Sequence, residues 1–285
     1  MSSRMIDAEH AEEIDYWCGR NATRVGKQTT ECGAIGISTS IRFWQGLPVI
    51  LGPAIAAGAI LWVHAFGLAY HLDAYETAPP TISRALLDAS IAGPFAIAMI
   101  ASAIFLVIAV SQVAFFLKRN MKMSGQDTTR HAALLFAVLV CEMAAIAGMI
   151  VLSQFTGNVN SQLHNIGSYM LFFGHAAGIG LAGLMIRSIL IKLDGKDPLP
   201  DAADGNWLAL RRFPRRAGWI AILSVLYGVV YFGGKFLPDE FFFWQRTVMS
   251  VLEVVVILSF LGFLAGFRPF LRVSKPLIKH QARDG

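Results

Sequence analysis

Charged residues are scarce in this 285-residue chain, where Asp, Glu, Lys and Arg together make up 15%. Soluble globular domains contain roughly a quarter of such residues. Hydrophobic residues account for 55% of the chain, and its mean hydropathy is +0.55. The low charge therefore excludes a soluble globular domain, and the composition is typical of an integral membrane protein.

Cysteine is rare as well. The three cysteines are Cys18, Cys32 and Cys141, and no two of them form a CxxC pair. Neither a disulfide framework nor a CxxC site is therefore present, and we interpret these residues as structural thiols.

The motifs of familiar soluble enzymes are missing too. The chain has no P-loop, GxSxG or HExxH motif and no internal repeat of 20–50 residues. It also lacks an RNP, zinc-finger or arginine-rich pattern, so we expect no nucleic-acid partner. Catalytic residues are unknown at this level, and whether the protein is an enzyme stays open, with a non-catalytic role preferred.

Long apolar runs dominate what is present. A hydrocarbon core of roughly 30 Å takes about 20 residues of helix to cross. Six runs meet that length, at about 47–70, 92–117, 132–154, 165–190, 217–237 and 241–267. The sequence therefore predicts an all-α polytopic membrane protein, with a six-helix transmembrane bundle over residues 46–268.

The basic residues predict the orientation, because Lys and Arg near span ends stay on the cytoplasmic side. They gather in the 118–131 loop, the 187–216 loop and the tail, whereas 155–164 has no charge. We therefore expect cytoplasmic N- and C-termini: a polar leader at 1–45, partly disordered, and a basic tail at 269–285. The basic loops should also attract anionic lipid headgroups, in line with the net charge of +5.

Two carboxylates lie within predicted spans, Glu142 in VLVCEMAAIAG and Glu253 in MSVLEVVVILS. A charged residue at the bilayer centre costs roughly 2.5–3.5 kcal/mol on an insertion scale, so such residues usually face the protein interior. Two interpretations remain open. Each Glu either is hydrogen-bonded to a neighbouring helix and fixes helix register, or it handles a proton or a ligand.

Histidines in two spans allow a haem hypothesis. His164 and His175 are eleven residues apart and share a helix face, at roughly 16 Å along the axis, and His64 and His71 are seven apart, at roughly 10 Å. If spans one and four were neighbours, these residues would form stacked pairs resembling the bis-histidine haem sites of six-helix b-type cytochromes. Interfacial or hydrogen-bonded histidines and a metal site are the alternatives.

Glycines on the same face as His164 and His175 weaken the haem hypothesis. Gly167, Gly174 and Gly178 recur there, and small residues at this spacing usually let another helix approach closely. We therefore expect no cofactor and no metal, and keep haem b as an alternative. Such helix contacts also make a homo-oligomer possible.

The segment before the second span reads YETAPPTISRALLDASIAGPF. Pro79 and Pro80 disfavour helix, and Thr81 then suits a helix N-cap. Arg84 and Asp88 follow at i, i+4 spacing, as in an ordinary exposed helix pair. The segment is therefore interpreted as a solvated cap over the bundle, with a ligand-binding loop as the alternative.

Several short motifs resemble the DRAM/FRAG/Sfk family of six-span membrane proteins. They are PTIS at 80–83 with Pro94-Phe95 after it, VLSQFTGNVNSQLHNIGSYMLFF at 151–173, and SVLEVVVILSFLGFLAGF at 250–267. The family includes damage-regulated autophagy modulators and FRAG-type proteins of GPI-anchor lipid remodelling. The resemblance covers roughly 45–268, and it departs at Arg84, where the family usually has Asp. His175 matches no family element.

The resemblance implies a role in membrane-lipid organisation, GPI-lipid processing or autophagy and trafficking control, at the plasma membrane or a Golgi- or lysosome-like endomembrane. Together with the polar residues, it predicts an outer-face cluster of Ser83, His164, Asn165 and Glu253 that orients a lipid headgroup. The competing hypotheses are a b-type haem protein with ligands from spans one and four, and a proton-coupled transporter that uses Glu142 and His175.

Overall fold

The computed structural model of the chain describes residues 46–70, 81–123, 125, 128–157, 159–194, 210–236 and 238–272. Every regular element in these ranges is a helix. Six of them are long and apolar enough to cross a membrane: α3 (Pro48–Tyr70), α6 (Ala89–Met123), α7 (Thr129–Gln154), α8 (Ser161–Asp194), α10 (Phe213–Gly233) and α11 (Phe242–Ala265). The all-α, multi-pass membrane fold is confirmed. The predicted leader, 1–45, lies outside the described residues, and so does 273–285 of the basic tail predicted at 269–285. Residues 269–272 of that tail belong to the short helix over Arg268–Arg272.

Helix bounds differ from the predicted spans mainly where polar turns extend a helix. The second and fourth spans were expected at 92–117 and 165–190, whereas α6 and α8 contain 35 and 34 residues. At 1.5 Å per residue, each is about 50 Å long and exceeds the hydrocarbon core. Hydropathy detects only the apolar part of a helix, but backbone hydrogen bonding continues into the headgroup layer. The fifth span is shifted toward the N-terminus, because α10 begins at Phe213 and ends at Gly233.

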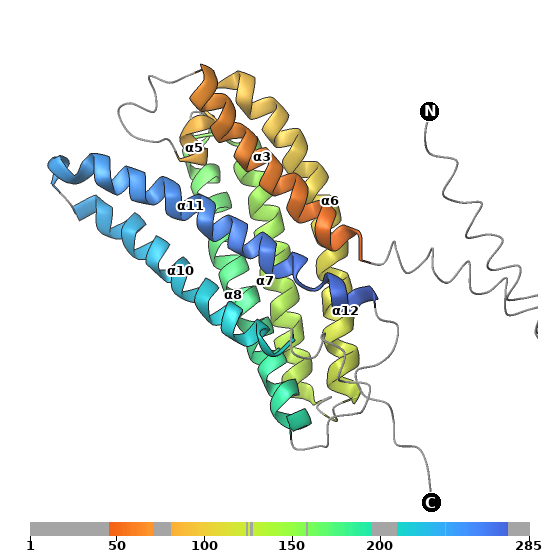
Figure 1. Cartoon of the computed structure of the whole chain (residues 1–285). Coiled ribbons are helices and arrows are strands. Elements are labelled where there is room, and N and C mark those ends of the chain that lie inside the picture. Colours follow the sequence, from red (N-terminus) through yellow and green to blue (C-terminus); the bar gives the residue numbers. More distant parts are fainter. Residues whose placement is uncertain are drawn as a thin grey trace, which may run out of the picture. The chain divides into compact units, whose positions relative to one another are not determined.

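The six long helices form a closed ring in chain order (Figure 1). Each packs against the next, from α3 through α6, α7, α8 and α10 to α11, and α11 returns to α3. Helix α8 also contacts α6 and α11 across the ring.

Glycines bring α7 and α8 together in the most extensive helix contact of the described residues. A Cβ atom added to Gly148 would lie 2.6 Å from the Gly167 carbonyl oxygen, and one added to Gly174 would lie 2.7 Å from the Cys141 carbonyl oxygen. These partners are backbone atoms that no rotamer change can move. The expectation that this glycine face lets another helix approach closely is confirmed.

Short helices close the ends of the bundle. Helix α5 (Ile82–Ala85) packs on α3, with Thr81 at its N-cap position but without a side-chain cap hydrogen bond. Ile82 and Leu86 are buried, so this segment is anchored to the bundle. The single turns η2 (Gly234–Phe236) and η3 (Asp239–Phe241) connect α10 to α11 at the same end of the bundle as α5, and α12 (Arg268–Arg272) packs on α6 at the other end.

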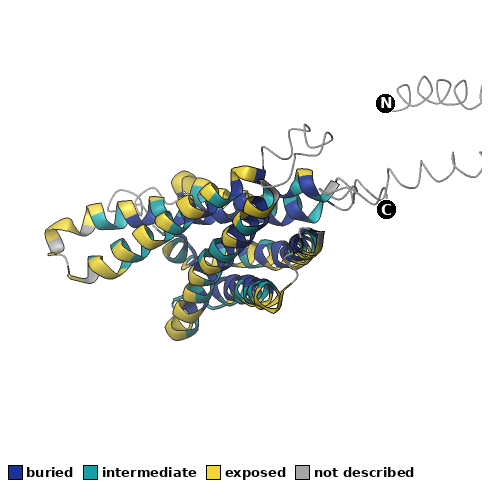
Figure 2. Ribbon diagram, turned by 90° about the horizontal axis from the view of Figure 1, so that it is seen from below, coloured by how far each residue is buried: buried dark blue, intermediate teal, exposed yellow. Residues whose placement is uncertain are grey.

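Burial is uneven among the helices (Figure 2). Half of the most apolar window of α8 is buried, against 11% of that of α10. Large apolar side chains such as Trp219 and Val225 of α10 are exposed, as expected of a surface that faces lipid. Helix α10 is therefore held mainly by one face, against α8 and α11.

Candidate functional site

A cavity of about 200 Å³ lies among α5, α8, α10 and α11. We call it the polar-aromatic pocket. Its lining combines hydroxyl, amide, imidazole and carboxylate groups with a wall of aromatic rings: Thr81, Ser83, His164, Asn165, Ser168, Tyr169, Phe172, Phe173, Ser224, Tyr227, Gly228, Tyr231, Phe232, Met249 and Glu253. All four residues of the predicted headgroup cluster are in this set, so the fold brings together Ser83, His164, Asn165 and Glu253.

Glu253 connects two distant parts of the chain. Its Oε2 atom accepts a hydrogen bond of 2.9 Å from the backbone N–H of Ile82, and both residues are buried. The bond satisfies one of the N–H groups that a helix leaves unpaired at its start. It therefore anchors α5 to α11 and places Ser83, the next residue of α5, at the rim of the pocket.

His164 is fixed by the turn that precedes α8. Its Nδ1 atom lies 2.8 Å from the Phe155 carbonyl oxygen. A carbonyl can only accept, so Nδ1 carries the hydrogen, and Nε2 of the neutral ring is an acceptor. One turn earlier, the Asn160 side chain accepts from the Leu163 N–H at 3.0 Å and caps the helix. The interpretation of His164 as a hydrogen-bonded histidine is confirmed.

The aromatic wall joins α8 to α10. Phe172 stacks on Tyr227 with 4.5 Å between ring centroids, and Tyr169 stacks on Phe232 at 6.4 Å. Sequence reasoning missed the α10 residues, Tyr227, Tyr231 and Phe232. The i, i+4 spacing of Tyr227 and Tyr231 was the available signal, because it puts both rings on one helix face.

The two intramembrane residues Glu142 and His175 form a buried pair on α7 and α8. His175 Nδ1 lies 2.7 Å from Glu142 Oε2. Two bare acceptors would repel each other at this distance, so one proton lies between them. Gly178 makes room for the Glu142 side chain, which occupies the space where a Cβ atom would be. The glycine that ends the sequence GHAAG in α8 thus leaves the space that the Glu142 side chain fills.

A small cavity adjoins this pair. It measures about 30 Å³ and is otherwise lined by apolar residues of α6, α7, α8 and α11, including Leu106 and Phe260. The Phe260 ring lies 5.2 Å from the His175 ring, centroid to centroid. One water molecule needs roughly 10–15 Å³ of such space together with polar partners. The volume is therefore sufficient for one water beside Glu142 and His175.

The haem hypothesis required spans one and four to be neighbours. The main partners of α3 are α6 and α11, and each of these helices also contacts α8. Helix α8, which carries His164 and His175, is therefore not among the main partners of α3, which carries His64. His71 is outside the described residues. Within the ranges that are described, no group of three or more His, Cys, Asp or Glu side chains is arranged to hold a metal ion.

Comparisons with protein-family models, curated proteins and solved structures gave no match for this chain. The resemblance to the DRAM/FRAG/Sfk family therefore remains an expectation from short motifs.

Proposed function

We propose that this multi-pass membrane protein binds a membrane lipid in the polar-aromatic pocket. One observation carries the proposal: Ser83, His164, Asn165 and Glu253 come from three separate helices, and they meet beside the aromatic wall in a single cavity. A lipid needs both kinds of surface, because its headgroup forms hydrogen bonds and its chains require apolar contact. The family resemblance supports the same role and implies lipid organisation, GPI-lipid processing or trafficking control.

The pocket's chemistry favours a headgroup rich in hydrogen-bond donors. Glu253 accepts hydrogen bonds, and so does Nε2 of neutral His164. Ser83 and Ser168 both donate and accept, and no Lys or Arg occurs among the described residues that line the pocket. Sugar and inositol hydroxyls or an ethanolamine amine satisfy these acceptors better than a bare phosphate does. An amine would also find aromatic faces for a cation–π contact.

Filling the pocket tests the proposal. Gly228 lines it, and a Cβ atom added there meets no other atom within 4 Å. Gly228→Leu should therefore occupy the cavity without disturbing helix packing. We expect wild-type protein to retain a lipid with a hydroxyl- or amine-bearing headgroup through purification, and the variant to retain roughly tenfold less, as measured by mass spectrometry of extracted lipids.

Gly58→Leu is the matched control, because Gly58 is exposed on α3 and its added Cβ atom also meets nothing. It should keep the wild-type lipid. A second variant alters the polar groups instead of the space: Ser83→Ala and His164→Ala remove a hydroxyl and an imidazole, and Glu253→Gln replaces the carboxyl group with an amide. Lipid retention equal to wild type in both pocket variants would refute the proposal.

A proton-coupled transporter is the second candidate function, favoured by the 2.7 Å contact between His175 and Glu142 inside the bundle. A shared proton beside a water-sized cavity is the arrangement that a proton relay requires. This function predicts substrate uptake that depends on the pH gradient in proteoliposomes and is abolished by Glu142→Gln. Gradient-independent behaviour of the wild type across substrates would rule it out.

A further inference from the structure

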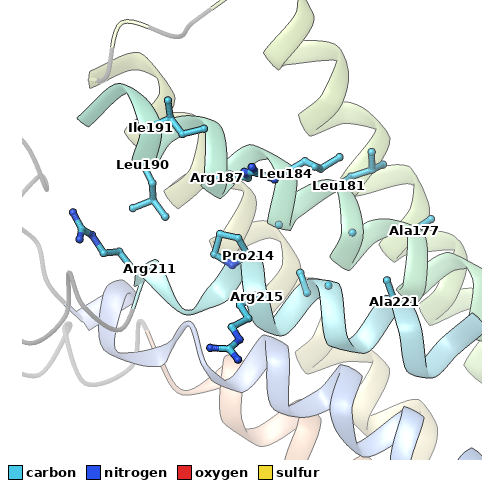
Figure 3. Close-up of a pocket in the computed structure, with 14 residues that line it drawn as sticks. Ala177, Leu181, Leu184, Arg187, Leu190, Ile191, Arg211, Pro214, Arg215 and Ala221 are labelled. Carbon is cyan, nitrogen blue, oxygen red and sulfur yellow. The ribbon is translucent and has the colours of Figure 1, made fainter. Parts of the chain in front are cut away.

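A second, larger groove lies at the opposite end of the α8–α10 pair from the polar-aromatic pocket. It measures about 980 Å³ and is formed by the last turns of α8 and the first turns of α10 (Figure 3). Its walls are apolar and small side chains, and three arginines line it: Arg187 of α8, and Arg211 and Arg215 at the start of α10. We call it the arginine groove.

Small residues give the groove its floor. At Gly183 the two helices touch, because an added Cβ atom would lie 2.5 Å from the Ala217 Cβ atom. Beside this contact, Gly180 and Gly218 line the groove, and a Cβ atom on either meets nothing within 4 Å. The two helices are thus in contact at Gly183. Beside this contact their facing surfaces carry no side chain at Gly180 and Gly218, which leaves an open depression between the helices. An apolar strip bounded by helix walls suits an acyl chain.

The described side chains that line the groove carry charge of one sign. Among them are three guanidinium groups and no Asp or Glu. Arg216 is the immediate neighbour of Arg215, but its guanidinium lies over the Phe213 ring, 5.8 Å from the centroid, and it does not line the groove. Guanidinium groups bind phosphate oxygens through two parallel hydrogen bonds. A phosphate is therefore the complementary group.

We propose that the arginine groove binds one anionic glycerophospholipid, with its phosphate at Arg187 and Arg215 and an acyl chain along Gly180 and Gly218. Charge complementarity selects this occupant. A second copy of the chain would bring the same positive residues, whereas an anionic lipid supplies both the negative charge and the apolar tail. This site is separate from the polar-aromatic pocket and does not depend on its function.

The test uses full-length protein in zwitterionic detergent, titrated with dioleoylphosphatidylglycerol and, separately, with dioleoylphosphatidylcholine, and followed by native mass spectrometry. We expect wild type to bind one phosphatidylglycerol in preference to phosphatidylcholine. A basic residue near an anionic lipid contributes roughly a fivefold gain in affinity. Arg215→Gln should therefore weaken phosphatidylglycerol binding about fivefold, and the double variant Arg187→Gln, Arg215→Gln about 25-fold.

Arg216→Gln is the matched control, since it removes the same charge one residue away but outside the groove. Gly218→Leu tests the chain-binding floor without altering charge, and Gly58→Leu is its control. Wild-type binding in the two controls, with losses in the other variants, supports the site. Equal losses of lipid binding in Arg215→Gln and Arg216→Gln would mean that the lipid is held by general charge attraction, and they would overturn the proposal.

Two further results would also overturn the proposal. Displacement of the lipid by millimolar inorganic phosphate would mean that the acyl chain contributes nothing and that the groove is a phosphate site. A doubled mass in wild type that Gly218→Leu returns to monomer, without any change in lipid binding, would identify the groove as an interface between copies.

Discussion

At the residue scale, Glu253 has a structural role and a proposed role in lipid binding, and a substitution can separate the two. One of its oxygens accepts the Ile82 N–H at 2.9 Å, which is a structural contact. The same side chain lines the polar-aromatic pocket, where it is proposed to meet a lipid headgroup. A substitution that keeps an acceptor oxygen but replaces the carboxyl group with an amide distinguishes the two.

We therefore predict that Glu253→Gln unfolds at nearly the wild-type temperature, because its amide oxygen still accepts the Ile82 N–H. Glu253→Ala leaves that buried N–H without a partner, which costs about 1–3 kcal/mol. Thermal unfolding in one detergent measures both. Equal destabilisation by Gln and Ala would contradict the structural role of the acceptor.

At the element scale, the contact of α7 with α8 depends on glycines whose neighbours are backbone atoms. Gly148 faces the Gly167 carbonyl oxygen, and Gly174 faces the Cys141 carbonyl oxygen. Van der Waals packing of this kind is the main attraction between helices in lipid, where no hydrophobic effect acts between them. The same close approach brings Glu142 within hydrogen-bonding distance of His175.

We predict that Gly148→Ala and Gly174→Ala each destabilise the bundle by roughly 1–3 kcal/mol, because the added methyl group forces the two helices apart. Gly180→Ala, on the same helix α8, should leave stability unchanged, because its Cβ atom points into open space. Unfolding in increasing SDS, followed by circular dichroism, measures the difference. A Gly180→Ala variant as unstable as Gly174→Ala would contradict this account of the packing.

At the scale of the whole molecule, two cavities lie at opposite ends of the same helix pair. His164 and Arg187 are separated by roughly 34 Å along α8, from a rise of 1.5 Å per residue, which is close to the thickness of the hydrocarbon core. The two proposed lipid sites would thus lie in opposite leaflets. The arginine groove belongs to the side that the positive-inside rule assigns to the cytoplasm.

The predicted orientation is testable with single cysteines in a variant that lacks Cys18, Cys32 and Cys141. Val159→Cys lies in the exposed turn between α7 and α8, and Arg130→Cys lies at the exposed start of α7. A membrane-impermeant thiol reagent should label Val159→Cys in intact cells and Arg130→Cys only after permeabilisation. The opposite pattern would reverse the topology and exchange the two leaflets.

Much of the site was accessible from the sequence, because polar residues in apolar runs are conspicuous. Ser83, His164, Asn165 and Glu253 were all predicted as one cluster, and they line one pocket. Glu142 and His175 were also singled out, although their direct hydrogen bond was not predicted. The aromatic wall of α10 was missed, because Tyr and Phe in a membrane span look like ordinary lipid-facing residues until their partners are known.

The sequence by itself determined the class of protein, the six spans and the residues that are costly to bury, because each follows from local composition and the thickness of a bilayer. Only the tertiary structure decided which helices are neighbours. Span order does not specify lateral packing, so the neighbours of α3 and the meeting of Glu142 with His175 depend on long-range contacts. The arginine groove likewise exists only where α8 and α10 touch at Gly183 and leave Gly180 and Gly218 uncovered.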